Sequence, residues 1–118
     1  MNTKQGNLEN IILNALWNLE ENYHEEINVA NIQFKINVNN KKWAYTTVKT
    51  VLDRLVEKKL VTRVKQGKKY CYRSKISRES AGETAIKNLL KRYYNDNFSE
   101  FLRAIEKVKD ENLLVTTR

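Results

Sequence analysis

The sequence contains no proline, and it has only one cysteine and one histidine among its 118 residues. The single thiol, Cys71, cannot form a disulfide within the chain, which agrees with a reducing compartment. His24 and Cys71 together supply too few ligands for a zinc site, so no metal or other cofactor is expected. We expect Cys71 to be a packed thiol inside a strand and His24 to be an exposed loop residue.

Long apolar runs are also missing, since no run of apolar residues exceeds three, as in residues 11–13. A membrane span needs about 20 such residues, so no membrane insertion is expected. The polar residues 1–10 lack the apolar segment of a secretory signal, and we therefore expect a cytoplasmic protein. No serine or cysteine has a histidine arrangement that would make it a nucleophile, so the chain is not expected to be an enzyme.

Positive charge is abundant and concentrated. The formal net charge is +8, and residues 41–73 hold eleven Lys and Arg but only two acids, a local charge of +9. Residues 1–40 carry −3 and residues 74–118 carry +2, so the whole excess lies in one stretch. Such a concentration is typical of a protein with a polyanionic partner, and nucleic acid is the first candidate.

Three stretches have apolar residues at helical spacing. They are residues 8–20 with Asn7 as cap, residues 28–36 with Asn28 as cap, and residues 44–59. The third has the clearest pattern, an apolar stripe opposite a polar face. The stripe consists of Val48, Val51, Leu52 and Leu55.

A β-hairpin is predicted directly after the third helix. Residues 60–65 and 70–73 alternate in polarity and are rich in β-branched or aromatic residues, with Tyr70 and Tyr72 on one face. Gly67 lies in the turn between them, where it can adopt a positive φ. Three helices followed by a hairpin predict a mostly α fold with a small β-hairpin, the winged helix-turn-helix.

Two further helices are expected in the tail. Ser77 or Ser80 can cap the first, residues 95–97 break it, and Phe98 begins the second. The expected organisation is a DNA-binding domain over residues 1–75 and a helical dimerisation region over residues 76–118. The apolar faces of the tail helices, together with Trp43 and Phe34, are expected to be buried by a homodimer. The expected interface residues are Ile86, Leu89, Leu90, Tyr93, Phe98, Phe101, Leu102 and Ile105.

Four segments carry a resemblance to a known family. Residues 43–61 (WAYTTVKTVLDRLVEKKLV) are followed by Gly67–Tyr72 (GKKYCY), while Leu16-Trp17 lies upstream and Ile76–Ser80 (ISRES) downstream. Over roughly residues 8–108 the chain resembles the BlaI/MecI/CopY penicillinase repressors. The resemblance implies a homodimeric winged-helix repressor of a resistance or stress operon, bound to a double-stranded DNA operator and controlled in some members by a membrane sensor and protease.

The chain departs from both known branches of that family. It lacks the Cys-x-Cys pairs of the copper-responsive branch, because Cys71 is its only cysteine. Ala104-Ile105 occupies the place of the Asn-Phe cleavage dipeptide of the β-lactam branch, and Asn97-Phe98 lies several residues earlier. The resemblance therefore leaves the inducing signal open.

The DNA contacts are expected on the third helix, its preceding loop and the wing. The outer face of the helix would read base edges in the major groove, and the cations around it would contact phosphates. The expected base readers are Thr46, Thr47, Lys49 and Thr50, with Thr47 partly turned toward the core. The expected phosphate contacts are Lys41, Lys42, Tyr45, Lys68 and Lys69.

Two other functions use the same fold, namely an RNA-binding module and a protein-interaction adaptor. Aromatic side chains interleaved with the basic residues are too sparse for typical RNA stacking. The threonine-lined face is polar and cationic, unlike an apolar docking face. We therefore favour a transcriptional repressor that acts as a homodimer on an inverted-repeat operator.

Overall fold

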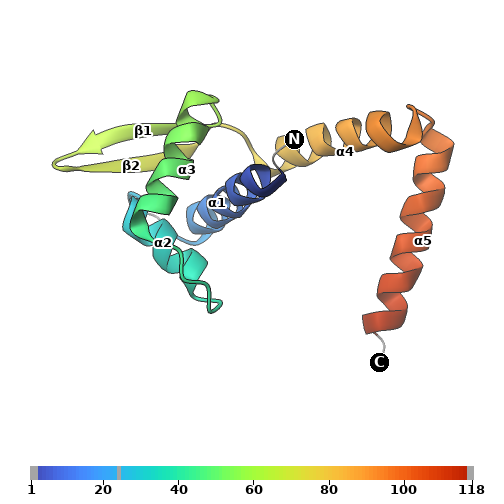
Figure 1. Ribbon diagram of the computed structural model, residues 1–118, viewed down its shortest axis with the longest axis horizontal. Coiled ribbons are helices and arrows are strands. Elements are labelled where there is room, and N and C mark those ends of the chain that lie inside the picture. Colours follow the sequence, from blue (N-terminus) through green and yellow to red (C-terminus); the bar gives the residue numbers. More distant parts are fainter. Residues whose placement is uncertain (1–2, 24, 117–118) are drawn as a thin grey trace. The chain divides into compact units, whose positions relative to one another are not determined.

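The computed structural model describes the backbone of residues 3–23 and 25–116 and the side chains of residues 6–23 and 25–112. His24 lies outside the described residues. Within them the elements follow the predicted order (Figure 1). They are α1 (Thr3–Asn22), α2 (Val29–Asn37), α3 (Tyr45–Glu57), β1 (Val61–Gln66), β2 (Lys69–Ser74), α4 (Arg78–Tyr94) and α5 (Phe98–Thr116).

The chain divides into two compact units, Met1–Arg78 and Glu79–Arg118. The first unit contains α1, α2, α3 and the hairpin, and the second contains almost all of α4 and the whole of α5. No helix in the described ranges has the length and apolar character needed to cross a membrane.

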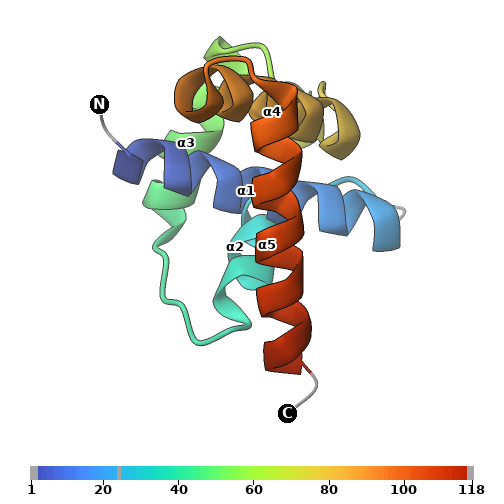
Figure 2. The ribbon, with the colours of Figure 1, turned by 90° about the vertical axis from the view of Figure 1, so that its right-hand side faces the viewer.

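The core of the first unit lies where α1, α2 and α3 pack against one another in pairs (Figures 1 and 2). The apolar stripe predicted on the third helix is fully buried there, at 1% exposure or less for every member. This burial fixes which face of α3 turns outward. The largest fully buried side chains are Ile12, Leu16, Ile32, Leu52, Leu55, Val48, Val51 and Val61.

Several local sequence signals delimit the elements as predicted, but Asn7, the predicted cap of the first helix, lies inside α1. Asn28 caps α2 in a reciprocal arrangement, in which Asn28 and Asn31 each accept a hydrogen bond from the other's backbone N–H at 2.9 Å. Gly67 adopts a φ of +64° in the hairpin turn. Asn95 and Asp96 both have positive φ, which breaks the helix between Tyr94 and Phe98. Asparagine and aspartate tolerate this conformation better than most residues.

The hairpin pairs β1 with β2 in antiparallel register from Val61 opposite Ser74 to Gln66 opposite Lys69. A third segment joins it, because Tyr72 N donates to Ile27 O at 2.7 Å and Asn28 forms a β-bridge with Cys71. This pairing attaches the base of the wing to the start of α2. The Cys71 thiol is buried, as expected for a packed thiol.

Helix α1 begins five residues before the predicted start at residue 8. Its first turns carry a buried acid, Glu9, whose carboxylate accepts hydrogen bonds from Lys58 Nζ at 2.8 and 2.9 Å. Lys58 lies directly after α3, so this ion pair joins α1 to the end of that helix. The sequence did not indicate this contact.

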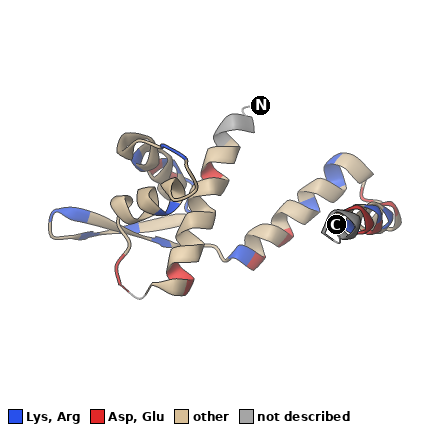
Figure 3. Ribbon diagram, turned by 90° about the horizontal axis from the view of Figure 1, so that it is seen from below, with Lys and Arg blue, Asp and Glu red and all other residues tan. Residues whose placement is uncertain are grey.

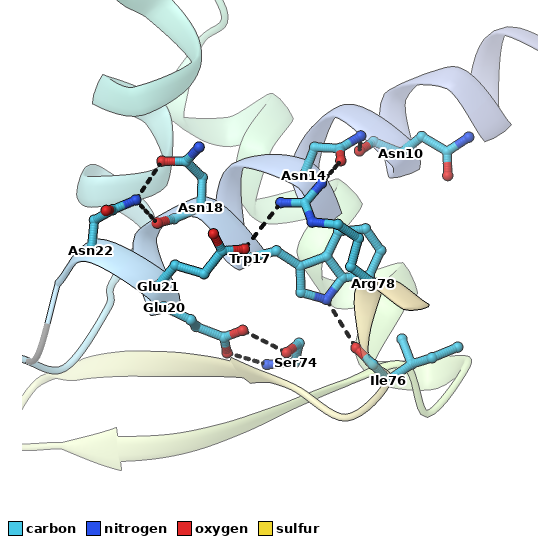
Figure 4. A network of polar contacts seen from close by, with 10 residues as sticks. All are labelled: Asn10, Asn14, Trp17, Asn18, Glu20, Glu21, Asn22, Ser74, Ile76 and Arg78. Carbon is cyan, nitrogen blue, oxygen red and sulfur yellow. Dashed lines mark hydrogen bonds and ion pairs between the residues drawn. The ribbon is translucent and has the colours of Figure 1, made fainter. Parts of the chain in front are cut away.

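The segment between β2 and α4 is held against α1 by side chains of that helix (Figure 4). Glu20 accepts hydrogen bonds from the N–H and hydroxyl of Ser74 at 2.7 and 2.6 Å. Trp17 Nε1 donates to Ile76 O at 2.9 Å, and the Arg78 guanidinium lies 5.1 Å from the Trp17 ring centre. The Glu20 carboxylate therefore fixes the end of the wing strand against α1.

Candidate nucleic-acid interface

The connection between α2 and α3 is held at a single residue. Trp43 N donates to Asn37 Oδ1 at 2.9 Å, and Trp43 O accepts from Asn37 Nδ2 at 3.1 Å and from Gln33 Nε2 at 3.0 Å. The Trp43 side chain packs against the core of the first unit. These contacts set where α3 begins relative to α2, as a helix-turn-helix requires.

The Trp43 packing corrects one expectation. Trp43 was predicted to need a dimer partner, but its own unit partly buries it. Phe34, predicted with it, projects from α2 and is 76% exposed. Neither residue belongs to the tail helices.

The outer face of α3 carries the predicted base readers. Thr46, Thr47 and Thr50 are all exposed, and Lys49 is partly exposed. Thr47 therefore does not turn into the core as expected. Because the opposite face of α3 is fully buried, these four side chains form a polar surface of fixed orientation.

The start of α3 offers groups that suit phosphate. Lys41 and Lys42 are exposed in the loop before it, and Tyr45 is 49% exposed in its first turn. The cap residue is Ala44, which makes no side-chain hydrogen bond to the helix. The first N–H groups of a helix lack intrahelical acceptors and carry partial positive charge, so they favour an anion at this point.

The wing contributes cations beyond those that were predicted. Lys68 and Lys69 are exposed at its tip, as expected. Arg63 and Lys65 on β1 are exposed too, and Lys and Arg recur along the hairpin (Figure 3). Alternation in the sequence predicted the strands, but it gave no reason to assign these two cations to the interface.

One carboxylate connects the outer face of α3 to the wing. Asp53 Oδ2 lies 3.2 Å from Lys49 Nζ, and Asp53 Oδ1 lies 3.1 Å from Arg63 Nη1. The Arg63 guanidinium lies 4.5 Å from the centre of the Tyr70 ring. Tyr70 is therefore an exposed partner of Arg63, whereas Tyr72 on the same face of the hairpin is buried.

Burial raises the pKa of Tyr72, and the negative charge of Asp53 raises it further. The Tyr72 hydroxyl is buried without a hydrogen-bond partner in the described part of the chain. It stays neutral over the ordinary pH range, because its pKa lies above the usual value of 10.0. The neutral Tyr72 therefore adds no charge beside the ion pairs that Asp53 forms with Lys49 and Arg63.

The second unit buries little of its own apolar surface. Phe101 is 6% exposed and packs between Tyr94 and Phe98. Its ring centre lies 5.5 Å from that of Tyr94 and 6.3 Å from that of Phe98. The other predicted interface residues remain accessible, with Leu90 partly exposed. Those that are 43–67% exposed are Ile86, Leu89, Tyr93, Phe98, Leu102 and Ile105.

Among the described residues, no three His, Cys, Asp or Glu side chains lie close enough to hold a metal ion. The arrangement consists instead of a polar helix face, a helix start suited to anions and a cationic hairpin. A model for the family described as Penicillinase repressor matches residues 5–113 of the chain. No curated protein sequence matches it.

Proposed function

Because the chain belongs to the penicillinase repressor family, whose members are winged-helix DNA-binding transcriptional repressors and not enzymes, we propose that it acts as a homodimer on an inverted-repeat operator. The observation that carries this proposal is the outer face of α3, which presents three exposed threonines and Lys49 opposite a fully buried stripe. A face of this kind fits the major groove, where each base pair has its own pattern of donors and acceptors.

The homodimer is supported by the second unit. A soluble helix pair is not expected to leave most of its large apolar side chains in water. Closed two-fold assemblies are the commonest way in which identical chains bury such a surface. A two-fold dimer presents two α3 helices in opposite orientation, and this requires two inverted half-sites about one helical turn, or a multiple of it, apart.

The regulated genes are proposed to form a resistance or stress-response operon, with a membrane sensor and protease as the upstream partner. The Asn-Phe pair of this chain lies at the start of α5, where Asn97 Oδ1 accepts a hydrogen bond from Glu100 N at 3.1 Å. That position differs from the one implied by the resemblance to the β-lactam branch. The proposal therefore does not extend to a cleavage site.

Replacing Lys49 or Thr50 by alanine is expected to weaken binding to the selected operator by about 1–3 kcal/mol and to change binding to random duplex DNA little. Each side chain would lose contacts to particular base edges, whereas phosphate contacts would remain. Titration of both DNAs with each variant measures the contrast.

Thr84→Ala is the matched control, because Thr84 is an exposed helical threonine of the second unit. It should leave both affinities unchanged, and all variants should melt at the wild-type temperature. An equal loss on operator and random DNA would assign α3 to backbone contact and overturn the proposed base readout.

A further inference from the structure

Asp53 is an acidic side chain in the middle of the helix that is proposed to enter DNA. Its carboxylate is about two-fifths exposed, and both of its oxygens are engaged by cations from different elements, Lys49 on α3 and Arg63 on β1. Negative charge at this place opposes the approach of phosphates. The surrounding 41–73 segment otherwise favours any polyanion, whatever its sequence.

Stability gives little reason for this arrangement. The Lys49 and Arg63 side chains are 43% and 37% exposed, and exposed ion pairs contribute about 0–1 kcal/mol to folding. The ion pair affects the availability of Lys49 for binding more than it affects folding. While its ammonium group is paired with Asp53, it is withheld from other anions, including DNA phosphates.

The competition differs between random and cognate DNA. On random DNA, Lys49 exchanges the Asp53 carboxylate for a phosphate and makes no further contact. This exchange of one anion for another adds little to the binding free energy. On a cognate site, hydrogen bonds to a base edge are added to the exchange. An element that penalises the wrong partner contributes to specificity as much as an attractive contact does.

We propose that Asp53 determines the DNA specificity of α3 by holding Lys49 away from phosphates until base contacts replace the ion pair. This inference rests on the proposed function. Arg63 keeps the carboxylate positioned when Lys49 leaves it. The guanidinium of Arg63 also lies over the Tyr70 ring, and this contact holds Arg63 on the wing.

The test compares Asp53→Asn with Glu57→Gln. Glu57 lies one turn further along α3, is exposed, and forms no ion pair among the described residues. Both substitutions raise the net charge by one, so they alter the general attraction to DNA equally. The readout is the ratio of operator affinity to random-duplex affinity at fixed salt concentration.

Asp53→Asn should raise random-duplex affinity about 5- to 10-fold and operator affinity less than about 2-fold, since release of Lys49 matters most where no base contact compensates. The ratio of operator affinity to random-duplex affinity should then fall at least about 2.5-fold. Glu57→Gln should leave the ratio at the wild-type value. Asp53→Glu keeps the charge four residues from Lys49 and should restore the wild-type ratio.

Repeating the comparison in a Lys49→Ala background tests whether Asp53 acts on specificity through Lys49. Without Lys49, Asp53→Asn and Glu57→Gln should have equal effects on the ratio. An equal ratio for the two variants in the wild-type background, or an undiminished effect of Asp53→Asn without Lys49, would overturn the inference. If the wild-type chain itself does not discriminate operator from random DNA, the proposed function has failed, which is a different result.

Discussion

Leu89→Glu is expected to convert the protein from a dimer to a monomer and to abolish tight operator binding. Leu89 is 43% exposed on α4 and belongs to the apolar face of the second unit. In a two-fold dimer the substitution occurs twice, and each unpaired charge buried at an interface costs about 3–5 kcal/mol. The dimer dissociation constant should therefore rise by at least about 1,000-fold.

Asn88→Glu provides the control, because it adds the same charge one residue away. At about 100° per residue around a helix, Asn88 lies about 150° from the centre of the face formed by Ile86, Leu89, Leu90 and Tyr93, and so it points away from that face. Sedimentation velocity at micromolar concentration should give a dimer for the wild-type chain and Asn88→Glu, and a monomer for Leu89→Glu. A monomeric wild-type chain, or a dimeric Leu89→Glu, would show that this face does not hold the dimer.

Operator binding should also be highly sensitive to salt. If each of two protomers neutralises three or four phosphates, the logarithm of affinity should fall with the logarithm of salt concentration with a slope of about −6. Raising salt from 50 to 200 mM should then weaken binding about 4,000-fold. The locally concentrated charge of residues 41–73 is the physical reason.

The double substitution Lys68→Ala and Lys69→Ala should reduce that slope to between about −2 and −3, because four phosphate contacts are lost per dimer. Operator and random DNA should weaken alike, since phosphate contacts carry no direct sequence information. Lys107→Ala with Lys109→Ala removes the same charge from α5 and should leave the slope near −6. An unchanged slope in the Lys68 and Lys69 variant would show that the wing tip does not contact DNA.

Features set by neighbouring residues could be predicted from the sequence. The stripe that includes Val48 and Leu52 identified the buried face of α3 and therefore its outer face. The cap at Asn28 and the turn at Gly67 were also correct, because side-chain hydrogen bonding and φ freedom act over a few residues. The polar start of α1 has no apolar periodicity, so its first turns were missed.

Contacts between distant residues could not be predicted in the same way. Glu9 and Lys58 are 49 residues apart, and Glu20 and Ser74 are 54 residues apart. Hydrophobic periodicity indicates which face of a helix is buried, but it does not indicate which charges meet across the core. The pairing of Asp53 with Lys49 and Arg63 is accordingly visible only in the folded arrangement.

Selection of bound sites from a pool of random duplex DNA, with a random single-stranded RNA pool in competition, tests the central claim most directly. A homodimeric repressor that reads bases through α3 should recover duplex DNA containing an inverted repeat, with half-site centres about one helical turn, or a multiple of it, apart. Recovery of no consensus, or preferential recovery of single-stranded RNA, would contradict the account.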